Sequence, residues 1–141
     1  MKFVKILFIA TVLLGLTGVS MPNPAYSKEI QWRSLKDALA SSKSENKKIF
    51  VYFYAEWCAT CKKMKKETFK DPGVIRALNK NFIPVRVDVD KNEKLSQIFK
   101  INLLPDTWFL TESHERIANR PGYISAELLK TLLKMVAENN Y

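Results

Sequence analysis

Residues that bind metals are scarce in this sequence, and their scarcity excludes several kinds of site. The chain has two cysteines and one histidine, His114, among 141 residues. A tetrahedral zinc site takes four ligands, so this chain could form one only by sharing the metal with a second chain. No internal repeat and no low-complexity segment is present either, which excludes repeat architectures. At this length we expect one domain.

Acidic residues are also few, and the chain is therefore basic. Asp and Glu number 14 against 23 Lys and Arg, which gives a formal net charge of +9. A basic exported domain can favour acidic protein faces or anionic lipid headgroups. The densest positive cluster consists of Lys62, Lys63, Lys65 and Lys66. It has no interleaved aromatic residues on which bases could stack, so we expect no nucleic-acid partner.

Long apolar runs are absent except at the N-terminus. Lys2 and Lys5 precede an apolar run over residues 6–19, and small residues follow it, a pattern typical of a secretory signal peptide. We therefore expect residues 1–27 to be a signal peptide and residues 28–141 to be the mature domain. The run is shorter than the roughly 20 apolar residues of a membrane-spanning helix. An uncleaved N-terminal anchor is the alternative.

Hydrophobic patterning beyond residue 27 predicts both helices and strands. Residues 49–54 form a continuous run of β-branched and aromatic side chains, which is typical of a strand buried on both faces. Apolar residues recur at every second position over residues 83–89, a period-two pattern that predicts a strand. Ser34, Asp71 and Ser125 are the expected N-caps of three helices.

The expected order of elements is helix, strand, helix, helix, strand, helix, strand, strand and helix. A polar loop over residues 41–48 separates the first helix from the first strand. The last strand is expected to end at Asn119, before a break at Pro121 and Gly122. Such an order predicts an α/β fold in which a central mixed sheet is flanked by helices on both faces.

The two cysteines are spaced as Cys58-Ala59-Thr60-Cys61, directly after the predicted buried strand and at the start of a helix. A helix N-terminus presents unpaired backbone N–H groups and the positive end of the helix dipole, and both favour thiolate over thiol. Because the thiolate is the nucleophile, we expect Cys58 to attack a disulfide. Cys61, one turn further on, is then placed to resolve the mixed disulfide and close a Cys58–Cys61 disulfide. We expect this chemistry to use no cofactor and no metal.

Other interpretations of the cysteine pair remain open. A structural disulfide is one, although a loop with two intervening residues constrains little chain entropy. Half of a zinc site shared between two chains is another. The third is a non-catalytic binding domain that uses the basic cluster as its docking face.

The run from Phe53 to Lys62, FYAEWCATCK, resembles the active-site segment of the thioredoxin superfamily. Extended to Pro72, the segment is similar to the C-terminal periplasmic domain of DsbD, the membrane conductor of reducing equivalents, and to its small exported relatives. The resemblance covers residues 34–137. It implies a thioredoxin-like fold and thiol–disulfide exchange.

The resemblance also implies which residues bind substrate. The superfamily has a cis proline that faces the cysteines, and Pro105, preceded by Leu104, matches it. In the superfamily the backbone there pairs with the substrate chain like an added strand. Trp57, beside the pair, would offer an apolar surface, so we expect Trp57, Leu104 and Pro105 to bind substrate. Gly122 matches a glycine near the same face, whereas Asp106 replaces the Thr that commonly follows the proline.

Two positions near the cysteines depart from the superfamily's pattern. Tyr52 stands where many thioredoxins have a buried Asp that moves the proton of the second thiol. Lys65 stands where the DsbD-type domain has another acid. Glu56 or water is left as the proton acceptor. Lys62 is expected to lower the pKa of Cys58 only slightly, because exposed charges are screened.

The residues between the cysteines predict the direction of the reaction. Strong oxidants of the superfamily resemble Pro-His there, whereas Ala59 and Thr60 supply neither a proline nor a cation, so we expect a reductant. Its partners would be disulfide-containing exported proteins, with a membrane thiol conductor of the DsbD type as electron donor. We expect a monomer, periplasmic if the source is a Gram-negative bacterium. A disulfide oxidant or isomerase is the alternative.

Overall fold

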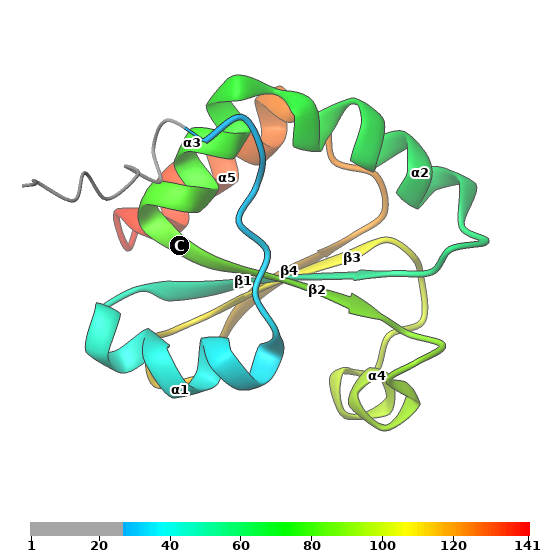
Figure 1. The fold of residues 1–141 in the computed structure, drawn as a ribbon, viewed down its shortest axis with the longest axis horizontal. Coiled ribbons are helices and arrows are strands. Elements are labelled where there is room, and N and C mark those ends of the chain that lie inside the picture. Colours follow the sequence, from blue (N-terminus) through cyan, green and yellow to red (C-terminus); the bar gives the residue numbers. More distant parts are fainter. Residues whose placement is uncertain (1–26) are drawn as a thin grey trace, which may run out of the picture.

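The fold is built on a four-stranded sheet (Figure 1). The computed structural model describes residues 27–141, so the predicted signal peptide, residues 1–27, lies outside the described residues except for Ser27. The strands are β1 (Lys48–Tyr54), β2 (Phe82–Asp88), β3 (Asp106–Leu110) and β4 (Arg116–Pro121), in the order β2-β1-β3-β4. β1 runs parallel to β2 and antiparallel to β3, and β3 runs antiparallel to β4, so the sheet is mixed.

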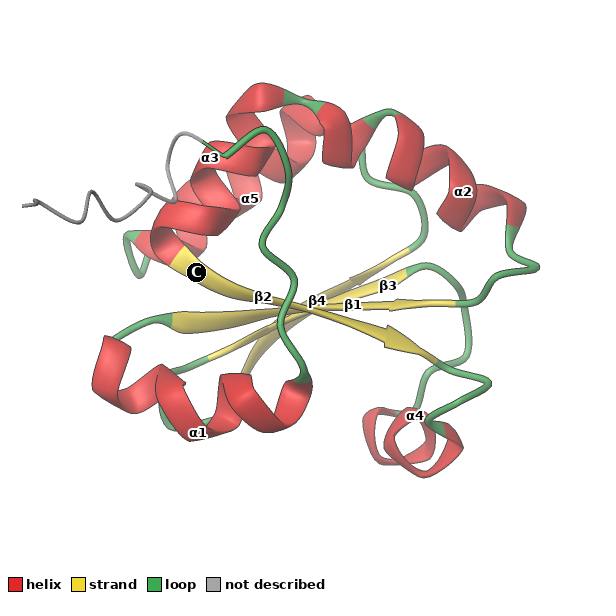
Figure 2. Cartoon of the chain, in the orientation of Figure 1, coloured by secondary structure: helices red, strands yellow, loops and turns green. Residues whose placement is uncertain are grey.

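Helices cover both faces of the sheet (Figures 1 and 2). On one face lie α1 (Leu35–Glu45) and α4 (Glu93–Phe99). On the other lie α2 (Ala59–Lys66), α3 (Pro72–Asn81) and α5 (Ala126–Ala137), with the short 3₁₀ helix η2 (Thr68–Lys70) between α2 and α3. The predicted α/β architecture, a mixed sheet flanked by helices on both faces, is confirmed.

Strand β1 is the centre of the core because its alternate side chains enter two different clusters. Phe50 and Tyr52 pack in the cluster beneath α2, α3 and α5. Val51 and Phe53 pack in the cluster on the α1 and α4 side. Burial on both faces explains why the sequence of β1 is a continuous apolar run. The C-terminal end of β1 therefore lies between the two helical layers.

The three predicted N-caps are confirmed. The hydroxyl of Ser34 accepts a hydrogen bond from the N–H of Asp37 at 3.1 Å, and Ser125 caps α5 through the N–H of Leu128. The carboxylate of Asp71 accepts the backbone N–H groups at the start of α3. Hydrogen bonds from the backbone N–H groups of Val74 and Gly73 lower the pKa of the Asp71 carboxyl group. These caps supply partners for N–H groups that a helix leaves unpaired.

Two predicted boundaries were wrong. The predicted loop over residues 41–48 is mostly helix, because α1 continues to Glu45 and is closed by Asn46 in the left-handed conformation. Lys43, Ser44 and Glu45 are exposed there, whereas Ser42 is fully buried. Strand β4 continues to Pro121, which pairs with Asp106. β4 is an edge strand, where a proline is tolerated because one side of the strand needs no N–H donor.

Candidate active site

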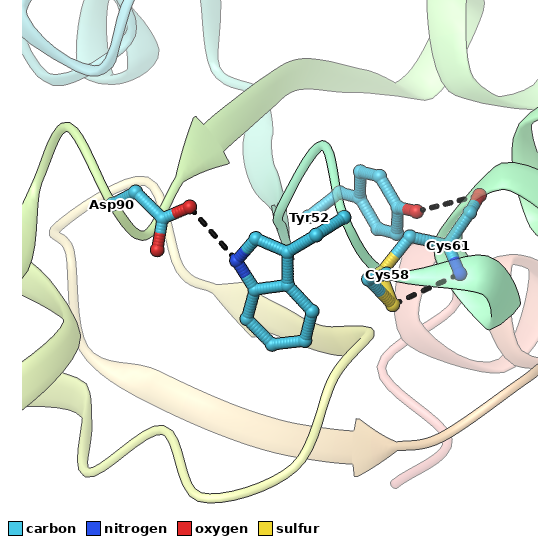
Figure 3. Close-up of a disulfide and its surroundings, with 5 residues drawn as sticks. Tyr52, Cys58, Cys61 and Asp90 are labelled. Atoms are coloured by element: carbon cyan, nitrogen blue, oxygen red, sulfur yellow. Dashed lines mark hydrogen bonds between the residues drawn. A yellow bond between two sulfur atoms is a disulfide. The ribbon is translucent and has the colours of Figure 1, made fainter.

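The cysteine pair lies where β1 ends and α2 begins (Figure 3). Cys58 is the N-cap of α2, and its Sγ accepts a hydrogen bond from the backbone N–H of Cys61 at 3.1 Å. A sulfur in this position takes up one of the unpaired N–H groups of the helix, as the side-chain oxygen of a Ser or Asp cap does. When the disulfide is reduced, the same N–H and the helix dipole favour negative charge on Cys58.

In this structure the pair is oxidised. Cys58 and Cys61 form a disulfide, with their Cα atoms 5.2 Å apart. Both residues are buried, Cys58 to 6% and Cys61 to 3% exposure. Cys58 is therefore the more exposed residue of the pair, although the protein covers most of both.

Trp57 is the most exposed large apolar side chain beside the pair, with 69% of its surface accessible. Its indole N–H donates a hydrogen bond to the carboxylate of Asp90 at 2.9 Å (Figure 3). Asp90 follows the end of β2, so the loop between β2 and α4 fixes the orientation of the indole. The sequence analysis did not identify Asp90, because nothing local relates two residues that are 33 positions apart.

A groove of about 700 Å³ runs between the pair and α4. It brings together Trp57, Cys58 and Leu104, and it includes Leu103, which is 57% exposed. The peptide bond between Leu104 and Pro105 is cis, as the resemblance implied, and Pro105 itself is buried. These side chains give the groove an apolar wall next to the reactive sulfur.

Gly122 is held close to the proline by the backbone. Its N–H donates a hydrogen bond to the carbonyl oxygen of Pro105 at 2.7 Å, and its φ is +89°. Only glycine adopts that conformation without strain. The glycine thus ties the end of β4 to the loop that carries Leu104.

A second cavity, of about 490 Å³, lies on the Cys61 side of the pair. Its walls include the predicted supporting residues Glu56 and Lys62, both exposed, together with Lys65. It shares no lining residue with the groove beside Trp57. The carboxylates on its walls are those of Glu29 and Glu56.

Tyr52 forms part of the wall behind Cys61. Its hydroxyl donates a hydrogen bond to the carbonyl oxygen of Cys61 at 3.2 Å (Figure 3). Burial raises the pKa of Tyr52 far above its usual value, and the neighbouring Tyr54 raises it further. Tyr52 is therefore neutral at physiological pH. It braces the first turn of α2 and cannot take the place of a carboxylate that accepts a proton.

Two other polar residues lie apart from the cysteines. Asp106 pairs in register with Phe53, so it is on the α1 and α4 face of the sheet, where burial raises the pKa of its carboxyl group. The amide of Asn119 donates to it at 3.4 Å. His114 lies in the turn at the opposite end of β3 from Pro105, and its Nε2 is 3.1 Å from the hydroxyl of Ser42. His114 therefore has a structural role that links α1 to this turn.

Within residues 27–141, no helix combines the length and apolarity needed to cross a membrane.

Comparisons with known proteins agree with this geometry. The family described as a thioredoxin-like domain matches residues 35–137. The thiol:disulfide interchange protein DsbD of Vibrio vulnificus is 41% identical over 98 residues, which are 65% of this chain and 16% of DsbD. Thioredoxin-1 of Drosophila melanogaster is 31% identical over 93 residues, which are 66% of this chain and 83% of that protein.

A solved structure supports the fold independently. The solution structure of a thioredoxin from Thermus thermophilus superimposes with a TM-score of 0.72 over 79% of this chain and 90% of that one, at 24% identity. At that identity the likeness shows the fold alone. The match to the thioredoxin-like domain over residues 35–137 assigns the family as well. The chain belongs to the thioredoxin-like family of thiol–disulfide oxidoreductases, with Cys58 and Cys61 as its Cys-x-x-Cys pair.

Proposed function

We propose that this protein reduces disulfide bonds in exported proteins, with Cys58 as the nucleophile and Cys61 as the resolving thiol. The observation that carries the proposal is the position of the Cys58 sulfur, which caps α2 and accepts the N–H of Cys61 at 3.1 Å. That position favours the thiolate in the reduced protein.

The reaction transfers two electrons from the cysteine pair to the substrate. The Cys58 thiolate attacks one sulfur of a substrate disulfide, which forms a mixed disulfide and releases the other substrate sulfur as a thiolate. Cys61 loses its proton and attacks the Cys58 sulfur, which releases the second substrate thiolate and leaves the Cys58–Cys61 disulfide. Both released thiolates then take up protons. Each further turnover requires a thiol donor, for which we propose a membrane thiol conductor of the DsbD type.

Substrate would bind in the groove lined by Trp57 and Leu104. The groove of about 700 Å³ places an exposed indole and an apolar wall next to Cys58. An extended substrate chain would pair with the backbone beside Pro105 in the manner of an added strand. The hydrogen bond from Trp57 to Asp90 already orients the indole ring, so the side chain of Trp57 loses little conformational freedom when substrate binds.

Glu56 is our candidate for the group that accepts the proton of Cys61. It shares the cavity wall with Cys61, and Tyr52 is excluded because its phenol stays protonated and donates to the carbonyl oxygen of Cys61. Replacing Glu56 by Gln should slow the second step severalfold, a modest effect because water can also accept the proton. Stopped-flow kinetics of mixed-disulfide decay would measure this, and an unchanged rate would remove Glu56 from the mechanism. Lys62 is exposed, so its support of the Cys58 thiolate should be small.

The reduction potential of the Cys58–Cys61 pair tests the direction of the reaction. The protein is equilibrated against dithiothreitol or glutathione buffers, and the oxidised fraction is measured. Because Ala59 and Thr60 provide no cation beside the thiolate, we expect a value close to the roughly −270 mV of thioredoxin. A value close to the roughly −120 mV of DsbA would make the protein an oxidant or isomerase instead.

Export is part of the proposal. Residues 1–27 would act as the signal peptide and residues 28–141 as the mature domain, a monomer in the periplasm of a Gram-negative source. N-terminal sequencing of the protein recovered from its native host tests this, because cleavage should leave Lys28 as the first residue. Recovery of the intact N-terminus in the membrane fraction would show an uncleaved anchor.

A further inference from the structure

The cavity on the Cys61 side has an aromatic floor that the proposed reaction does not use. The rings of Tyr52 and Tyr54 are stacked, with centroids 5.7 Å apart and planes within 4°. Trp32 and Phe69 complete the floor. Tyr52 and Phe69 are recessed, at 4% and 6% exposure, whereas Trp32 and Tyr54 are half-buried.

Positive side chains surround this floor. The cations on its rim are Lys62, Lys65, Lys66, Lys70 and Arg86. Lys62, Lys65 and Lys66 share one face of α2, because positions three and four residues apart on a helix are neighbours, and Lys70 of η2 lines the same cavity. Arg86 comes from β2, across the cavity.

Most of these cations have no anionic partner within the described residues. Lys70 is 3.4 Å from the carboxylate of Glu29. No ion pair within residues 27–141 involves the other three lysines of the rim or Arg86. Lys63, in contrast, points away and lies over the ring of Tyr123, 4.7 Å from its centroid. The positive charge is therefore concentrated on the cavity, beside the resolving cysteine.

We infer that this cavity binds an extended acidic segment of a protein partner. From Lys62 to Lys66 the rim spans about 6 Å at the rise of a helix, and Lys70 of η2 extends it further, so the rim can contact several residues of an extended chain. Acidic side chains of such a segment would pair with the rim, and one apolar side chain would rest on the aromatic floor. The inference concerns binding alone and does not depend on the direction of electron transfer.

The shape of the cavity favours a peptide over other anionic surfaces. A bilayer surface is broad, and anchoring to it uses exposed aromatic side chains, whereas Tyr52 and Phe69 are buried and neither Trp32 nor Tyr54 is fully exposed. Stacking of nucleic-acid bases likewise needs exposed ring faces. A narrow chain can enter a recess of about 490 Å³.

Calorimetric titration with a defined peptide tests the inference. The probe is the acetylated, amidated peptide of sequence DEFED, and the uncharged peptide NQFQN is its control. We expect DEFED to bind the oxidised protein and NQFQN to bind at least tenfold more weakly. The K65Q/K66Q variant should bind DEFED about tenfold more weakly than the unmodified protein, since two ion pairs are lost.

A charge-matched variant separates the cavity from general attraction. K63Q/K94Q also removes two exposed lysines but leaves the cavity rim intact, so its affinity for DEFED should stay within twofold. Equal weakening of both variants would overturn the inference, as would the absence of DEFED binding. Binding of phosphatidylglycerol vesicles without DEFED binding would assign the basic rim to a membrane surface instead. Retained peptide binding in Cys58→Ser would show that the site is independent of the redox reaction.

Discussion

The groove next to Cys58 and the cavity next to Cys61, the two hollows beside the cysteine pair, differ in the kind of surface that they present. The groove next to Cys58 has an apolar wall of exposed side chains, chiefly Trp57 and Leu103, and polar residues of α4 also line it. The cavity next to Cys61 is rimmed by cations and has aromatic rings at its floor, of which Tyr52 and Phe69 are buried. One disulfide thus separates a surface suited to unfolded or extended apolar substrate from a surface suited to acidic groups.

This contrast suggests that the reaction and the choice of partner can be altered separately. The attacking sulfur faces the apolar groove, where substrate is proposed to bind. The covered sulfur and its candidate proton acceptor, Glu56, face the cationic cavity. Substitutions of the apolar side chains of the groove should therefore leave acidic-peptide binding nearly unchanged, and substitutions of the rim lysines Lys65 and Lys66 should leave disulfide reduction nearly unchanged.

The largest expected effect comes from removing the attacking sulfur of Cys58, which lines the groove and not the cavity. Cys58→Ser should abolish disulfide reduction in an assay with a disulfide-linked peptide and dithiothreitol as donor, because serine has no comparable nucleophile at neutral pH. The groove and the cavity should both keep their shape, so DEFED binding should persist.

Cys61→Ala should instead accumulate a mixed disulfide with substrate. Full activity of Cys58→Ser in a complementation test would favour the non-catalytic adaptor.

A substitution in the apolar groove should affect the reaction and leave peptide binding intact. Trp57→Ala removes the exposed indole and should lower kcat/KM about tenfold, in the range of losses seen for large aromatic contacts. The free energy of unfolding should change little, since the side chain is 69% exposed. Steady-state kinetics and urea unfolding measure the two effects. An unchanged kcat/KM would show that substrate binds elsewhere.

On the opposite side, Tyr52→Phe should alter stability more than rate. It removes the hydrogen bond to the carbonyl of Cys61 and keeps the ring, so the free energy of unfolding should fall by about 1 kcal/mol. The rate of disulfide reduction should stay within twofold, because Tyr52 does not accept a proton in our mechanism. A tenfold loss of rate at preserved stability would contradict that assignment.

The smallest effect is expected at Asp106, the buried acid on the α4 side. Burial raises the pKa of its carboxyl group, so the folded protein binds the proton more tightly than the unfolded chain does. The ionised carboxylate therefore costs stability at neutral pH, and this cost disappears as pH falls below the usual pKa of Asp. Asp106→Asn should be slightly more stable than the unmodified protein at pH 7 and equal to it near about pH 3. Urea unfolding at both pH values would reveal the opposite trend if Asp106 were stabilised by its contact with Asn119.

Local patterns in the sequence predicted much of the fold. The apolar run of β1, the alternation in β2 and the caps at Ser34, Asp71 and Ser125 all specify nearby backbone, which short-range hydrogen bonding and side-chain periodicity determine. The Cys58-x-x-Cys61 spacing at the start of a helix is likewise predictable from neighbouring residues alone. The error over residues 41–48 arose because polar residues on the exposed face of a helix look like a loop.

Only the tertiary structure decided what surrounds the cysteines. The bond between Trp57 and Asp90 and the meeting of Lys65 with Arg86 at one cavity both join distant parts of the chain. These contacts depend on the strand order β2-β1-β3-β4, which brings the end of β2 beside the end of β1. Sequence alone determined where a reactive pair could form. The tertiary fold determined which partners can approach the pair. The apolar wall and the cationic rim each combine residues that are distant in the sequence, and these residues come together only when the sheet forms.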